Sequence, residues 1–175
     1  MSIGRKSSPA AERVSNELRT ESSATLRQRR LIVALSLVAG GSMGLITLYQ
    51  MGIIDHLPEP PLGRLDADRV DASGEAYNLF KTPDAALGLG SYAVTLALAA
   101  AGGADRARTQ PMLPVALATK VAFDALGAIF LTVEQGSKHR KFCSWCLVAS
   151  AASLAMVPAV VPETRQAWKT MRGRS

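Results

Sequence analysis

The stretch Cys143–Val161, CSWCLVASAASLAMVPAVV, contains no charged residue and carries the only two cysteines of the chain at its start. At a rise of 1.5 Å per residue, a helix of about 20 apolar residues spans the hydrocarbon core of a bilayer. The stretch therefore predicts a membrane-spanning helix that begins with a Cys-x-x-Cys pair.

Three further apolar blocks of similar length precede this one. They are Leu31–Met51, Ala85–Gly103 and Pro111–Val133. The first two are uncharged, and the third contains only Lys120 and Asp124 as charged residues. We expect an all-α membrane protein built as a four-transmembrane-helix bundle. A soluble helical bundle is the alternative, and it is disfavoured because soluble helices of this length normally carry a polar stripe.

The charges are distributed unevenly, so the net charge of +6 argues for a membrane orientation rather than for nucleic-acid binding. Three basic regions lie before the first span, between the second and third spans, and after the fourth span. Their charged residues are Arg5, Lys6, Arg13, Arg19, Arg27, Arg29, Arg30, Arg106, Arg108, Arg165, Lys169, Arg172 and Arg174. The positive-inside rule places these regions in the cytoplasm and the acidic loop 52–84 outside. Lys138, Arg140 and Lys141 are the exception, because they would also lie outside.

We therefore expect a multi-pass protein of the bacterial inner membrane with both N- and C-termini in the cytoplasm and no nucleic-acid partner. Residues 1–28 are expected to form a disordered basic tail, 29–162 the membrane domain and 163–175 a short basic tail. The outer loop contains Pro58–Pro61, PEPP, which excludes a helix interior there. Val70–Phe80 is predicted to form a short helix, either as a lid over a pocket or as a solvated connector.

The pair Cys143 and Cys146 predicts reversible disulfide chemistry at the membrane surface. A zinc site would need two more ligands, and the only histidines, His56 and His139, are expected to be exposed in loops. We therefore predict no metal site. Covalent haem is excluded because Leu147 follows the second cysteine where a histidine would be required.

Both cysteines are the predicted catalytic residues. A helix that begins at Cys143 directs free N–H groups and the positive end of its dipole at the sulfur, which favours the thiolate. Cys143 is expected to face a partner on the water side, and Cys146, one turn deeper, a ligand among the helices. Trp145 is expected to belong to the interfacial aromatic belt or to stack on a planar ring.

Lys120 and Asp124 in the third span are four residues apart and share one helix face. Charges inside a membrane are costly and are often functional. The pair is expected to neutralise itself in the bundle interior, and a proton path is the alternative.

These features resemble the vitamin K epoxide reductase family in its bacterial membrane form, over about residues 30–161. The resemblance rests on the four spans, the long outer loop, Thr82-Pro83 leading into Leu87–Tyr92, and Cys143–Cys146 opening the last span. It implies a four-helix bundle around a quinone, either ubiquinone or menaquinone, that accepts electrons from thiols. It also implies that Cys146 lies beside the quinone and that Cys143 exchanges disulfides with a loop cysteine or a partner. The implied partner is a periplasmic thioredoxin-like dithiol protein.

Further site residues are expected, and the chain departs from the family in two respects, one of which is the charge of Asp84 near the expected quinone pocket. The predicted cofactor contacts are Cys146, Trp145, Ser150 and Asp84, and the predicted loop residues are Ser73 and Tyr77. Family members usually carry two more cysteines in the outer loop, the second of which would fall near Ala67, and this chain has none. The expected function is a quinone-dependent thiol/disulfide oxidoreductase. The alternative is a non-catalytic membrane subunit with a structural or vestigial cysteine pair.

Overall fold

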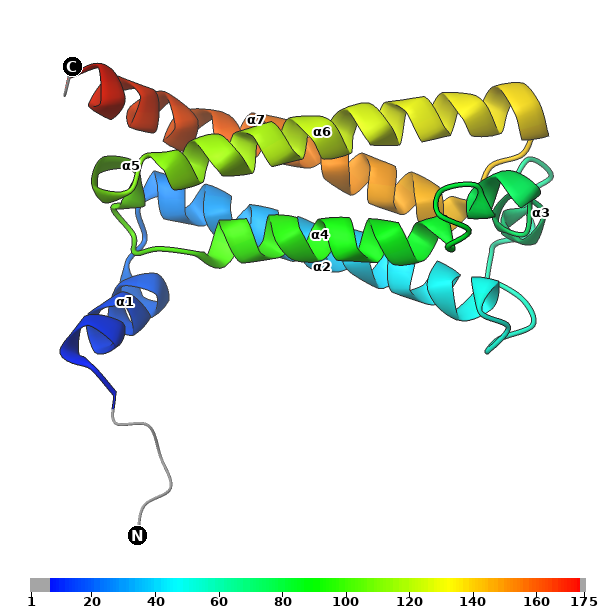
Figure 1. Cartoon of the computed structure of the whole chain (residues 1–175), viewed down its shortest axis with the longest axis horizontal. Helices are drawn as coiled ribbons and strands as arrows, with labels where there is room; N and C mark the ends of the chain where they lie inside the picture. The colour runs from blue at the N-terminus through cyan, green and yellow to red at the C-terminus, as the bar shows by residue number, and fades with distance from the viewer. Residues whose placement is uncertain (1–6, 174–175) are drawn as a thin grey trace, which may run out of the picture.

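Four long helices lie side by side and form most of the computed structural model, which describes residues 7–173 (Figure 1). They are α2 (Ala24–Gln50), α4 (Asp84–Ala100), α6 (Met112–Glu134) and α7 (Ser144–Arg172). The helices α2, α6 and α7 are each long and apolar enough to cross a membrane, and α4 is a shorter apolar helix of 17 residues. The predicted all-α bundle of four membrane helices is confirmed.

The short elements lie at the two ends of the bundle (Figure 1). At one end, called here the tail end, lie α1 (Pro9–Thr20), α5 (Arg106–Thr109) and the C-terminal part of α7. The opposite end, called here the loop end, holds α3 (Ala67–Asp71), the 3₁₀ turn η1 (Gly74–Tyr77), the π-helical turn η2 (Gln135–His139) and the start of α7. The three basic regions of the sequence therefore share the tail end.

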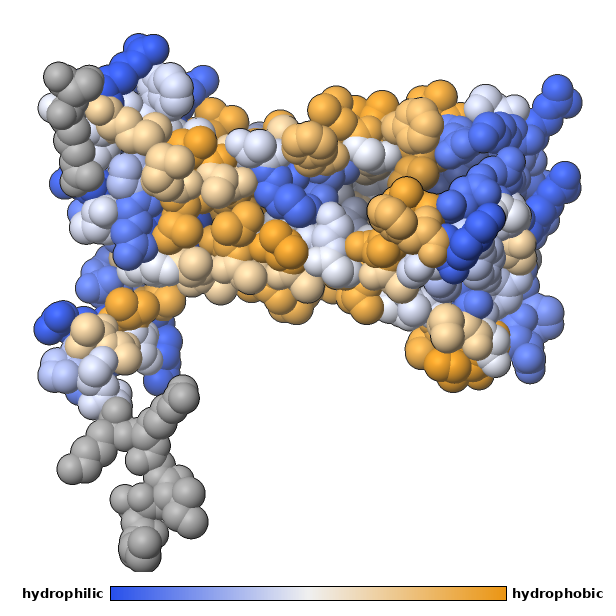
Figure 2. Space-filling view, viewed as in Figure 1, coloured by the Kyte–Doolittle hydropathy of each residue, from blue (hydrophilic) through white to orange (hydrophobic). Residues whose placement is uncertain are grey.

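The surface of the bundle matches a lipid environment. Large apolar side chains of α6 are exposed, among them Phe123 at 72% and Phe130 at 66%. Figure 2 shows hydrophobic residues along the middle of the molecule and hydrophilic residues at both ends. An exposed apolar surface of this extent favours hydrocarbon over water as its solvent.

The interior of the bundle is packed mainly through small side chains. Ala39 of α2, Ala99 of α4 and Ala152 of α7 are all at most 5% exposed and belong to one buried cluster with Met156. Small residues let helices approach closely where lipid supplies no hydrophobic driving force. The hydroxyl of Ser36 donates to Ile32 O at 2.8 Å, so its polarity is satisfied inside its own helix.

Two expectations about local structure differ from what the structure shows. The tail predicted to be disordered contains α1, whose first turn is capped by the Ser8 hydroxyl accepting from Ala11 N at 3.2 Å. Residues 24–28 also belong to α2, and residues 1–6 lie outside the described part. The single helix predicted over Val70–Phe80 is instead α3 and η1, separated because Ser73 is extended at φ −65° and ψ 150°.

A buried ion cluster holds the tail end together. Arg106 donates to both carboxylate oxygens of Glu163, at 2.9 and 2.8 Å, and none of the three partners Arg29, Arg106 and Glu163 is more than 3% exposed. Arg29 also donates to main-chain carbonyls beyond α4, including Gly103 O at 2.8 Å. The cluster therefore ties α2, α4, α5 and α7 to one another.

Candidate active site: a dithiol beside an apolar cavity

The helix α7 begins with the sulfur of Cys143 as its cap. Cys143 Sγ accepts from Cys146 N at 3.2 Å, so one free N–H group of the first turn points at the sulfur, as predicted. A second helix-start N–H, that of Ser144, donates to Glu59 Oε1 at 2.7 Å. Both thiols are free in this structure.

Cys143 is completely buried in this structure, and its contact with a partner on the water side stays a prediction. It packs in an apolar cluster with Ile46, Leu57, Val70 and Ala85, which come from three different parts of the chain. The outer loop folds over the sulfur because its apolar residues must leave water, and this covering is a tertiary effect that the sequence pattern does not reveal.

Polar contacts with residues on both sides of Cys143 in the chain hold the outer loop over its sulfur. The carboxylate of Glu59 bridges two segments, accepting from Ser144 N and from Ala67 N at 2.7 Å each. The indole N–H of Trp145 donates to Pro58 O at 2.8 Å. A parallel bridge joins Leu65 to Phe142, beside Asp66 N donating to Phe142 O at 3.0 Å.

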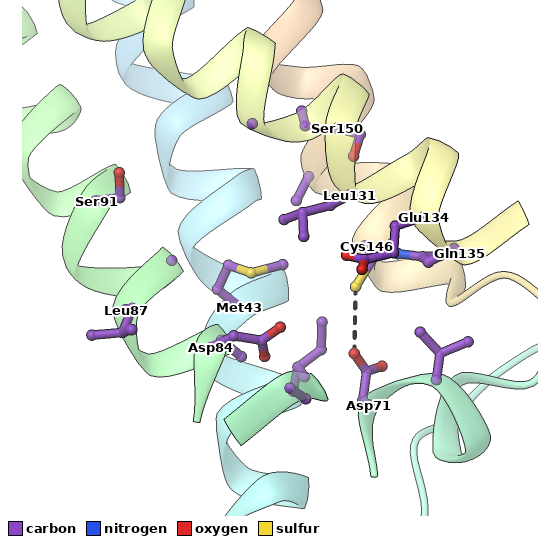
Figure 3. A pocket seen from close by; sticks show the side chains of 18 of the residues that line it. Met43, Asp71, Asp84, Leu87, Ser91, Leu131, Glu134, Gln135, Cys146 and Ser150 are labelled. Carbon is purple, nitrogen blue, oxygen red and sulfur yellow. Dashed lines mark hydrogen bonds between the residues drawn. The ribbon is translucent and has the colours of Figure 1, made fainter. Parts of the chain in front are cut away.

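Asp71 lies against the dithiol and was not predicted as a site residue. Its Oδ1 is 3.5 Å from Cys146 Sγ, and the contact is drawn in Figure 3. Its Oδ2 is the only buried side-chain oxygen or nitrogen in residues 7–173 that has no hydrogen-bond partner. Burial raises the pKa of the Asp71 carboxyl to about 6, against the opposing effect of its hydrogen bonds with Cys143 and Cys146.

A cavity of about 770 Å³ opens beside Cys146 between α4 and α6, and the hollow is visible in Figure 2. Its wall is mainly apolar, and residues from α2, α4, α6 and α7 surround it in Figure 3. Phe123 and Leu79 line the cavity and are also 72% and 58% exposed, so the cavity opens on the lipid-facing surface. Its size and lining fit a planar apolar ring compound that enters from the bilayer.

A polar cluster lies in the cavity wall deeper in the bundle. Lys120 pairs with Asp124, and the carboxylate also accepts from Ser91 Oγ at 2.9 Å and Thr95 Oγ1 at 2.7 Å. The side chain of Asp124 is only 7% exposed. The predicted self-neutralising pair is confirmed, and the alternative of a proton path stays a prediction.

The remaining predicted residues divide into two sets. Ser150, Asp84 and Ser73 line the cavity with Cys146, and their predicted contacts with a cofactor stay a prediction. Trp145 and Tyr77 are not among its lining residues: Trp145 fastens the loop, and the Tyr77 hydroxyl donates to Gln50 O at 3.0 Å. Both aromatic side chains therefore hold the loop end in place, and a contact of Trp145 with the cofactor stays a prediction.

Two expectations about histidines have different outcomes. His56 is exposed in a loop, with its side chain 84% accessible, as predicted. His139 is not an exposed loop residue: it lines the cavity, and its side chain is only 16% accessible, with Nε2 at 3.8 Å from Glu75 Oε2. The turn η2 directs it inward, and no motif in the sequence signals this turn.

Other polar residues of the site also had no sequence signal. Gln50 Nε2 donates to Asp84 Oδ1 at 2.8 Å and to Asp71 O at 3.2 Å, so one side chain joins α2, α3 and α4. Gln135 Oε1 accepts from Cys143 N at 3.0 Å. Gln50 and Gln135 are polar residues within apolar helices. The sequence could have identified them as site residues only if it also showed which face of each helix points into the bundle.

The fold and site together define a multi-pass membrane protein with a dithiol at the rim of a lipid-accessible cavity. The chain belongs to the vitamin K epoxide reductase family, whose family model matches residues 30–161. This family generally comprises quinone-dependent thiol oxidoreductases. Comparison with curated proteins and with solved structures gives no match.

Proposed function

We propose that this protein is a quinone-dependent thiol/disulfide oxidoreductase of the bacterial inner membrane. In this proposal, a periplasmic thioredoxin-like dithiol protein delivers electrons to the Cys143–Cys146 pair, and a membrane quinone, ubiquinone or menaquinone, receives them. The observation that carries the proposal is the position of Cys146, whose side chain lines the apolar cavity while its sulfur lies within 4.8 Å of Cys143 Sγ.

The chain's own residues supply the thiol chemistry. The Cys146 N–H group donates to Cys143 Sγ at 3.2 Å and so holds that sulfur at the start of α7, beside Cys146. Each cysteine gives up one proton and one electron when the disulfide forms, and a short side-chain rotation brings the sulfurs to bonding distance. A quinone bound in the cavity would take up these two electrons and two protons and become a quinol.

Several residues suit the binding of a quinone in this cavity. The apolar walls exclude water, and the side chains of Ser150 and Asp84 place oxygen atoms on the surface that a ring would meet. Ser150 Oγ lies 3.2 Å from Thr132 Oγ1, whose own O–H donates to Ala128 O at 2.7 Å, and a ligand carbonyl could accept from the Ser150 O–H in place of Thr132. Entry between α4 and α6 matches the lipid solubility of a quinone.

The orientation in the membrane is part of the proposal. The three basic regions lie at the tail end, and the dithiol lies at the loop end. The positive-inside rule then favours both termini in the cytoplasm and the dithiol at the periplasmic surface.

Delivery of electrons from a protein partner requires the outer loop to move, because Cys143 is buried. The family's usual loop cysteines are absent, so the partner dithiol must reach Cys143 directly. The few polar contacts that fasten the loop make a local opening less costly than unfolding of the bundle.

The test is quinone reduction by an added dithiol with the purified protein. Cys146→Ser and Cys143→Ser should each reduce the rate to that of the uncatalysed reaction. The matched control is Ser144→Ala, a hydroxyl removed between the two thiols, which should keep the rate within about twofold because only the main chain of Ser144 contacts Glu59. Full activity of Cys146→Ser would refute the assigned role.

The alternative, a non-catalytic membrane subunit, is favoured by the complete burial of Cys143 and by the missing loop cysteines. A redox titration with thiol alkylation separates the two functions. A catalytic pair should have a reduction potential of about −120 to −270 mV, whereas a structural disulfide should lie below about −300 mV.

A further inference from the structure

Asp71 places a carboxylate oxygen beside the two sulfurs of the dithiol. All three atoms are of kinds that can bind a metal ion. One carboxylate oxygen of Asp71, Cys143 Sγ and Cys146 Sγ all lie within 4.8 Å of one another. Within residues 7–173, this is the one group of three or more His, Cys, Asp or Glu side chains with such spacing. The three residues come from α3 and from the start of α7, which the folded loop brings together.

The separation of Cys146 Sγ from Asp71 Oδ1 matches that of two ligand atoms in a tetrahedral zinc site. With Zn–S of about 2.3 Å and Zn–O of about 2.0 Å, two ligand atoms at a tetrahedral angle lie roughly 3.5 Å apart. The observed distance from Cys146 Sγ to Asp71 Oδ1 is 3.5 Å. The Cys-x-x-Cys spacing across a helix start is also the usual way in which two thiolates bind one ion.

The Asp71 carboxylate is also suited to a cation electrostatically. It is 4% exposed, and its Oδ2 has no hydrogen-bond partner in the described chain, so its ionised form is poorly stabilised without a cation. Asp84 lines the same cavity and adds negative potential near it. The N–H of Cys146 donates to Cys143 Sγ at 3.2 Å, so the first turn of α7 fixes the position of that sulfur.

We propose that the reduced dithiol and Asp71 form a binding site for Zn²⁺ or a similar thiophilic divalent cation. The protein supplies three ligands, and the fourth position faces the cavity and takes water or another small ligand. Binding converts two thiols to thiolates and releases their two protons to solvent. Since disulfide formation uses the same two sulfurs, the ion and the disulfide exclude each other, and the ion holds the pair reduced.

The experiment is a Zn²⁺ titration of the full-length, metal-free protein in detergent, kept reduced without oxygen, in competition with a chromogenic chelator. The wild type should bind one equivalent. Asp71→Asn should weaken binding by about tenfold or more, since it removes a charged ligand. Asp84→Asn, a carboxylate of the same cavity outside the cluster, should change the affinity by less than about threefold. Protein oxidised to the disulfide should not bind.

Further variants keep the result interpretable if Asp71→Asn folds poorly. Asp71→Cys restores an anionic ligand and should bind Zn²⁺ at least as tightly as the wild type. Co²⁺ in place of Zn²⁺ should give the absorption of a tetrahedral thiolate site in the wild type and in Asp71→Cys. Unchanged affinity in a folded Asp71→Asn protein, or loss of binding in Asp71→Cys, would overturn the proposal.

The titration needs no turnover, so it is independent of the proposed quinone chemistry. A protein that binds Zn²⁺ but does not reduce quinone would refute only the proposed function. A protein that reduces quinone but gives equal Zn²⁺ affinities for wild type and Asp71→Asn would refute only the metal site.

Discussion

Removing the side chain of Glu59 should expose Cys143 without disturbing the bundle. The carboxylate accepts two main-chain N–H groups, from Ser144 and Ala67, at 2.7 Å each. Glu59 is half-buried, each bond is worth about 1 kcal/mol, and the two together are worth about 2 kcal/mol. Since 1.4 kcal/mol is a factor of ten, Glu59→Ala should raise the open fraction of the loop roughly 30-fold.

The assay is the alkylation rate of Cys143 by iodoacetamide, followed by mass spectrometry in a Cys146→Ser background that leaves a single thiol. When the loop closes faster than the reagent reacts, the rate follows the open fraction. Asp55→Ala, which removes an exposed carboxylate from the same loop, is the matched control and should stay within about twofold. An unchanged rate in Glu59→Ala would show that Glu59 does not hold the loop over the sulfur.

Three further predictions concern the bundle and the cavity. Glu163→Gln leaves the two buried arginines of the tail end without a counter-charge, and should lower the free energy of unfolding by about 3–5 kcal/mol. Thermal inactivation in detergent measures this, and an unchanged midpoint would contradict it. Lys120→Met or Asp124→Leu alone should destabilise more than both together, because each single change leaves a charge unpaired; additive losses in a double-mutant cycle would count against the pairing. Gly127→Phe should raise the KM for quinone about tenfold or more, since a side chain there meets no atom within 4 Å and would occupy the cavity. Gly41→Phe, equally open but away from the cavity, is its control, and equal KM values in both variants would refute the location of the quinone.

The membrane helices were predictable because their signal is local. A charge-free block of about 20 residues has few stable alternatives to a spanning helix, so the four blocks and the observed helices agree in number and order. The residues at which the helices begin and end were less predictable. Helix α7 continues from the predicted end at Val161 to Arg172, because a helix that leaves the bilayer need not stop there. Helix α1 did have a local signal, a Ser8 cap followed by Pro9 at its first position.

The site was predictable mainly where its residues lie on those helices, and Ser73 of the outer loop is the exception. Cys146, Ser150 and Asp84 line the cavity because the helix positions already place them at the loop end. Asp71 and Glu59 reach the dithiol through the folding of the outer loop, which depends on contacts between distant segments. The folded loop also buries Cys143 and binds the Trp145 indole outside the cavity. The sequence around these two residues does not predict either arrangement.

The guanidinium of Arg29 has a consequence for the surrounding lipid. It donates to Ala99 O at 3.1 Å, Ala101 O at 3.0 Å and Gly103 O at 2.8 Å, and so supplies hydrogen bonds where α4 ends. With 17 residues, α4 is only about 25 Å long, shorter than the roughly 30 Å of an average hydrocarbon core. Because a neighbouring helix satisfies these carbonyls, α4 can end before it reaches the headgroups. Hydrophobic mismatch then thins the bilayer locally on that flank, and we expect the protein to partition into vesicles with shorter acyl chains.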